Sequence, residues 1–153
     1  MSEFSRRQIK EAVNGLVSGF KEWGHCCTNI YSCHNNPAEI YIITKAGKDS
    51  VEFLVKVLIK EEDGRVLNGI AQILGRIKDS RAIDPLIDLL EMESDRAESH
   101  RYYIRIAARN ALLSIGRIAS KEVKEALLKA FKTRSLNPET QGTMGYIYIC
   151  LSC

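Results

Sequence analysis

The chain has 153 residues, of which 45% are hydrophobic and 27% charged, with a formal net charge of +3. This length corresponds to one domain with a real core, and the composition excludes wholesale disorder. No apolar run reaches the ~20 residues of a membrane span, and no apolar stretch follows the first residues as in a secretory signal. The charge is milder than that of most dedicated nucleic-acid binders. Five cysteines cannot all pair within one chain, so we expect free thiols in a reducing cytoplasm.

The first predicted element is a helix from Phe4 to Trp23. Its apolar residues recur at helical spacing, and they are Ile9, Val13, Leu16, Val17 and Phe20. A loop rich in cysteine and histidine is expected to follow and to lead to the first of several related segments.

Three consecutive segments then repeat one pattern, at about 37–62, 65–93 and 95–132. Each has a helix, a turn next to Gly47, Gly75 or Gly116, and a second helix whose apolar residues are spaced 0, 3, 4 and 7. The stripes are Val51, Leu54, Val55 and Leu58, then Ile83, Leu86, Ile87 and Leu90, then Val123, Ala126, Leu127 and Ala130. A single helical pair cannot bury such a stripe, so we expect the units to stack.

The turns carry helix-end signals. Each of the three glycines is predicted to end its first helix with a positive φ. Polar residues then cap the second helices, namely Asp49-Ser50, Asp79-Ser80 and Ser120, and Pro85 fits the first turn of its helix.

The last residues contain an apolar stretch, 146–151. It is predicted either to pack on the last repeat as a tail or to begin a further first helix. We therefore interpret 1–153 as a single domain with an N-terminal helix and Cys/His loop (1–36), repeats (37–132) and a C-terminal tail or partial repeat (133–153).

The segment from Ile73 to Leu90 resembles a HEAT-like repeat of the phycobilisome-lyase type. It reads ILGRIKDSRAIDPLIDLL, with Leu-Gly-x-Ile followed by Asp-x-x-Ala-Ile-x-Pro-Leu. The third unit matches through 107–118 but has Glu125 where the proline would stand, and the first unit matches weakly. The resemblance implies an all-α fold, a short right-handed α-solenoid (α-α superhelix) of HEAT-like helical hairpins that serves as a binding scaffold. Some relatives attach bilin pigments, but no bilin-specific motif is present, so a lyase role rests on resemblance alone.

The second helices line the concave surface in solenoids of the type that the chain resembles. The exposed residues of these helices have mixed charge in the first unit, are acidic in the second, and are basic or apolar in the third. This alternation fits a protein partner better than a nucleic-acid backbone, which would need like charges throughout. We therefore expect a non-catalytic scaffold that binds a protein or peptide. The predicted contact residues are Lys56, Lys60, Asp84, Asp88, Lys124 and Lys132.

An alternative is nucleic-acid or phosphate binding. Arg101, Arg105 and Arg109 recur every four residues on one predicted helix, beside Tyr102 and Tyr103. A row of positively charged side chains with aromatic neighbours can bind phosphates. The competing interpretation is an ordinary solvated helix face.

A second alternative is a metal site. The candidate ligands are His25, Cys26, Cys27, Cys33 and His34, and thiolates and imidazoles are the ligands that zinc takes in structural sites. Their spacing is irregular for zinc, so a loop with packed thiols competes with this interpretation, and we expect no cofactor. Cys150 and Cys153 form a Cys-x-x-Cys pair that could complete such a site.

Motifs for catalysis are missing from the sequence. It holds no Gly-rich phosphate loop, no Gly-x-Ser-x-Gly and no His-Glu-x-x-His, so we expect no catalytic residues. The end faces of so short a solenoid could also stack on a second copy, which makes a homo-oligomer possible.

Overall fold

The computed structural model describes residues 3–23, 37–92 and 98–153, and the regular structure of these residues is entirely helical. The helices are α1 (Arg6–Trp23), α2 (Pro37–Ala46), α3 (Val51–Lys60), α4 (Gly64–Ile77), α5 (Ile83–Leu90), α6 (Glu98–Gly116), α7 (Ser120–Thr133) and α8 (Pro138–Cys150). Two short 3₁₀ turns, η1 (Gly47–Ser50) and η2 (Ser80–Ala82), precede α3 and α5. The all-α solenoid predicted from the sequence is confirmed.

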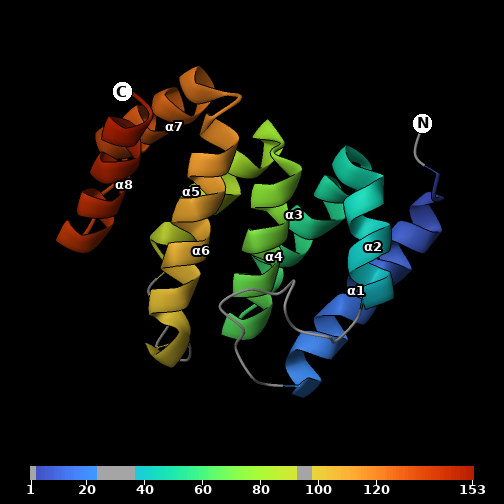
Figure 1. Cartoon of the computed structure of the whole chain (residues 1–153). Helices are drawn as coiled ribbons and strands as arrows, with labels where there is room; N and C mark the ends of the chain where they lie inside the picture. The colour runs from blue at the N-terminus through green and yellow to red at the C-terminus, as the bar shows by residue number, and fades with distance from the viewer. Residues whose placement is uncertain (1–2, 24–36, 93–97) are drawn as a thin grey trace.

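The helices form two layers. First helices α4, α6 and α8 stand side by side, and second helices α3, α5 and α7 lie behind them (Figure 1). The largest helix–helix contact joins α4 to α6, while α5 packs on both α6 and α7. The residues after 133 therefore form a helix, α8, which packs on α6 and α7 in the place of a further first helix.

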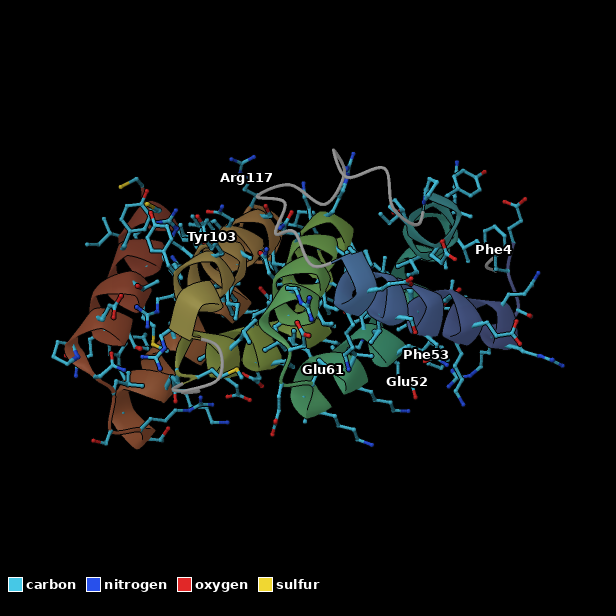
Figure 2. The ribbon with its side chains drawn as sticks, turned by 90° about the horizontal axis from the view of Figure 1, so that it is seen from below. Phe4, Glu52, Phe53, Glu61, Tyr103 and Arg117 are labelled. Atoms are coloured by element: carbon cyan, nitrogen blue, oxygen red, sulfur yellow. The ribbon has the colours of Figure 1, made fainter. Side chains whose placement is uncertain are left out.

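The N-terminal end departs from the predicted hairpin of 37–62. Of the two helices that precede α3, it is α1 that packs against α4, as well as against α2 and α3, whereas the main neighbours of α2 are α1 and η1. Seen from below, α1 runs between α2 and α3 (Figure 2). The physical reason is the size of the apolar faces. α2 buries only Ile43 and Ala46, whereas α1 carries a longer stripe whose Phe20 ring packs against Gly69 of α4.

One continuous apolar core runs from α1 to α8. The three predicted stripes supply its second-helix side, and all of their residues except Val55 and Ala126 are buried. The first helices supply the other side, mainly with residues of α4 and α6. Burial of each large aliphatic side chain contributes about 1.5–3 kcal/mol, so stacking of the repeats provides the driving force for the fold.

The glycines at the turns play different roles from the one predicted. Gly47 has a φ of 53°, as expected. Gly75, however, lies inside α4, and Lys78 takes the left-handed conformation (φ 58°) that ends this helix. Gly116 is the last residue of α6 and packs against the Leu151 side chain. The prediction was wrong for Gly75 and Gly116. Glycine is needed at these two positions because a neighbouring residue packs where a side chain would be, and neither position requires a positive φ.

The capping prediction is confirmed for Asp79 only. Its carboxylate accepts a hydrogen bond from the Arg81 backbone N–H at 3.0 Å, before α5 begins, and Pro85 lies in the first turn of that helix. The hydroxyl of Ser50 instead donates to the Gly47 carbonyl, at 2.7 Å, and the hydroxyl of Ser120 donates to the Leu151 carbonyl, at 3.2 Å. Ser50 thus closes its own turn, η1, whereas Ser120 ties the start of α7 to the residue that follows α8.

Candidate interaction groove

A groove of about 550 Å³ lies between α4 and α6. Its floor is made of small buried residues, among them Gly75, Ala107 and Ala111. Its walls are longer side chains of both helices, most of them polar or exposed. On α4 and its C-terminal cap these are Asn68, Gln72, Arg76 and Lys78, and on α6 they are Tyr102, Tyr103, Ile106, Asn110 and Ser114.

The spacing of the lining residues explains why a groove forms. Asn68, Gln72 and Arg76 follow one another at intervals of four, so they share one face of α4. A Cβ on Gly75 would lie only 2.7 Å from the Ala111 Cα, so the two helices pack too closely here for a side chain to fit between them. Small residues at this contact, flanked by longer side chains on both helices, leave the groove open.

Carboxamide side chains lie along this groove. The Gln72 Nε2 donates to the Asn68 Oδ1 at 3.1 Å, and Asn68 is only 6% exposed, so the α4 amides are held in place. Asn110 presents a third, exposed amide on α6. An amide both donates and accepts hydrogen bonds, which is the capacity needed to bind an extended peptide backbone.

The two ends of the groove differ in chemistry. At one end the rings of Tyr102 and Tyr103 meet edge to face, with centroids 5.5 Å apart, and they are 67% and 38% exposed. Toward the other end lie the cations Arg76 and Lys78. Among the described residues that line the groove there is no Asp or Glu. Figure 2 shows Tyr103 on α6, on the opposite side of the molecule from Glu52 and Phe53 of α3.

The six residues predicted for the second-helix surface are distributed over α3, α5 and α7. Two of them are engaged: Lys56 pairs with Glu52 at 2.6 Å, and Asp88 accepts from Arg134 at 2.6 Å. Lys60, Asp84 and Lys132 are exposed, and Lys124 is half-buried. Lys56 and Lys60 also line a second groove, of about 410 Å³, between α3 and α1. The sequence pattern does not indicate this groove, because nothing in it places α1 beside α3.

The predicted arginine stripe contacts α8. Arg105 forms an ion pair with Glu139, and its side chain is 13% exposed. Burial and the neighbouring charge of Arg101 lower the pKa of Arg105. The Arg109 guanidinium lies 5.6 Å from the centroid of the Tyr146 ring, in cation–π geometry. In this arrangement Arg105 and Arg109 help to hold the last helix.

The predicted metal ligands His25, Cys26, Cys27, Cys33 and His34 lie outside the described residues. Cys150 and Cys153 are free and exposed. Within residues 3–23, 37–92 and 98–153, no three His, Cys, Asp or Glu side chains are grouped so that they could hold a metal ion. None of the helices in these ranges has the length and apolarity needed to cross a membrane.

Comparison with protein families gives one match. Residues 40–101 match the family of HEAT repeats. The matched segment begins in α2, contains α3, α4 and α5, and ends in the first turn of α6. It therefore includes the α4 wall of the groove, and it supports the prediction of HEAT-like repeats. Neither the curated proteins nor the solved structures gave a match.

Proposed function

We propose that this chain is a non-catalytic scaffold that binds a peptide segment of a protein partner in the groove between α4 and α6. Stacked helical repeats commonly provide extended binding surfaces. The observation that carries the proposal is the groove itself, about 550 Å³ of space between two repeats, with amides along its walls and an exposed tyrosine pair at one end. Tyrosine is enriched among the residues that dominate binding energy at interfaces.

The chemistry of the lining supports binding without catalysis. Its polar groups are carboxamides, hydroxyls and two cations, which can hold a ligand through hydrogen bonds and charge. No cofactor is part of the proposal. The resemblance of Ile73–Leu90 to the phycobilisome-lyase type supports a scaffold of the same architecture, in the reducing cytoplasm that the cysteine usage predicts, and supplies no pigment chemistry.

The predicted second-helix surface is the competing location for the same function. A partner on that surface would have to share or displace the ion pairs of Lys56 and Asp88, and this competition weakens the case for it. The arginine stripe is the competing location for phosphate binding, but Arg105 and Arg109 already contact α8. The α4–α6 groove requires no such exchange at Tyr102 and Tyr103, which are exposed.

The test is a selection of random twelve-residue peptides displayed on phage against the immobilised chain, followed by affinity measurement on the selected peptides. We expect Tyr103→Ala to weaken binding at least tenfold, because an exposed aromatic anchor contributes strongly to peptide affinity. The matched control is Tyr41→Ala, which removes a 54% exposed tyrosine on α2, outside the groove. Equal affinities for the wild type and the Tyr103→Ala variant would place the binding site elsewhere and overturn the proposal.

A further inference from the structure

The α4–α6 groove is asymmetric in charge. Two cations, Arg76 and Lys78, lie toward one end, and none of its described lining residues is acidic. The neighbouring carboxylate of Asp79 is already bound by Arg81, whose Nε and Nη2 donate to it at 2.8 and 3.0 Å. Arg76 and Lys78 give this end of the groove positive charge, and Arg76 in addition interacts within the chain.

The other end of the groove is apolar and aromatic. Tyr102 and Tyr103 expose large parts of their rings, and Ile106 lies one turn further along α6. Such a surface accepts an apolar or aromatic side chain, because rings offer wide contact area at small entropic cost. The groove thus has one end suited to an apolar group and one suited to an anion.

The distance between the two ends follows from the helix register. Gly75 lies opposite Ala111, and the two helices stand side by side (Figure 1). Tyr103 precedes Ala111 by eight residues, which is about 12 Å at a rise of 1.5 Å per residue. Arg76 and Lys78 lie just beyond Gly75, so the two ends are roughly 13–17 Å apart. An extended chain covers this span with about four to five residues.

On the basis of the proposed function, we infer that the groove selects an extended acidic peptide. An apolar or aromatic side chain of the peptide packs against the tyrosine pair. An Asp or Glu four to five residues away meets Arg76 and Lys78. Between them, the Asn110 amide, whose Oδ1 already accepts from Arg109 at 3.4 Å, donates its N–H groups to the peptide backbone. Charge complementarity excludes a basic segment, since like charges at the Arg76 end would repel it.

A single-stranded nucleic acid is the other anionic ligand with rings that stack on tyrosine. The groove fits it less well, because a phosphate track requires a line of cations and this groove has two, both toward the same end. The spacing between the apolar and charged ends also corresponds to the reach of a few peptide residues.

The test uses the pool of phage-selected peptides from the proposed-function experiment. We expect the pool to be enriched in Asp or Glu four to five residues from a Phe, Tyr, Trp or Leu. We also expect the double variant Arg76→Glu, Lys78→Glu to bind the best selected peptide at least tenfold more weakly and to select basic peptides instead. The matched control, Lys45→Glu on α2, changes an exposed charge outside the groove and should leave the affinity unchanged.

The other outcomes separate the two proposals. Peptides that bind without acidic enrichment, but still lose affinity in Tyr103→Ala, would overturn the acidic preference and leave the scaffold function standing. Displacement of the best peptide by an equimolar labelled oligo(dT) single strand would overturn it in favour of a nucleic-acid ligand. A selection that yields no binder would overturn both proposals.

Discussion

Gly75 of α4 packs directly against Ala111 of α6. A Cβ on Gly75 would stand 2.7 Å from the Ala111 Cα and 2.9 Å from its Cβ, closer than non-bonded carbon atoms come in proteins. The neighbour is backbone and cannot rotate away. This one contact lets the two repeats interlock, and it forms the floor of the groove.

We therefore expect Gly75→Ala to destabilise the protein. An alanine gains about 1 kcal/mol of helix propensity over glycine, but forcing a methyl group into a packed contact costs about 1–3 kcal/mol. The net loss should be about 1 kcal/mol, measured by urea unfolding followed by circular dichroism.

The control for this variant is Gly142→Ala in α8. A Cβ at this position meets nothing within 4 Å, so only the propensity acts, and the stability should rise by about 0.5–1 kcal/mol. If Gly75→Ala raised the stability as Gly142→Ala is expected to do, the contact between Gly75 and Ala111 would not be a tight one.

The sequence predicted the helices well because the core is made by repeated apolar stripes. Val51, Ile83 and Val123 occupy the same place in the three stripes, and each is buried. What the pattern could not show is which helices become neighbours. The position of α1 beside α4 depends on the Phe20 ring fitting over Gly69, a contact between residues 49 positions apart.

The candidate groove was missed for the same reason. Its walls come from two repeats, and neither wall looks like a site by itself. A signal was present in the sequence, since Asn68 and Gln72 are polar residues in a helix that is otherwise largely buried. Polar residues on such a face need a partner or an open surface, and here they have both.

Lys78 offers a test in which stability and binding change in opposite directions. Its left-handed φ of 58° is strained by roughly 1 kcal/mol for a residue with a Cβ. Lys78→Gly should therefore stabilise the protein by about 0.5–1 kcal/mol in urea unfolding, because glycine suits this position at a helix end. The same change removes one of the two groove cations, so the affinity for acidic peptides should fall.

The converse control is Gly47→Ala. The φ of Gly47 is also positive, and its surroundings are open, so this variant should lose about 1 kcal/mol with no effect on peptide affinity. A Lys78→Gly variant that binds acidic peptides as tightly as the wild type would show that Lys78 does not contact them.

Asp79 should make the stability depend on pH in the acid range. Its carboxylate accepts hydrogen bonds from the Arg81 side chain, and these bonds lower its pKa. Arg81 also donates to the Lys48 carbonyl at 2.7 Å, so the cluster links η2 to η1. A pKa that is lower in the folded state means that the charged form is stabilising. The contribution is complete above the unfolded pKa of about 4 and is lost as the pH falls through the folded value.

The substitution Asp79→Asn isolates this effect. The variant should be less stable than the wild type at pH 7, and urea unfolding at a series of pH values should show the difference shrinking below pH ~4. A difference that stays constant down to pH ~2 would mean that the side chain acts through its shape and hydrogen bonds, and that its charge contributes nothing.

Asp84 distinguishes the groove from the predicted second-helix surface. It is exposed in the first turn of α5, in the second of the two helix layers, whereas Asp88 also holds Arg134 of the segment that follows α7. Asp84→Lys therefore reverses the charge of that surface without breaking the ion pair of Asp88. It removes a favourable interaction with the N-terminal end of α5, worth about 0.3–1 kcal/mol, so the fold should survive.

A partner on the second-helix surface would lose affinity for the Asp84→Lys variant, because the acidic residues of α5 were predicted to attract it. A peptide in the α4–α6 groove would bind as before. We expect fluorescence polarisation to show unchanged binding of the selected peptides by Asp84→Lys and weakened binding by Tyr103→Ala; the reverse pattern would transfer the binding site to the second helices.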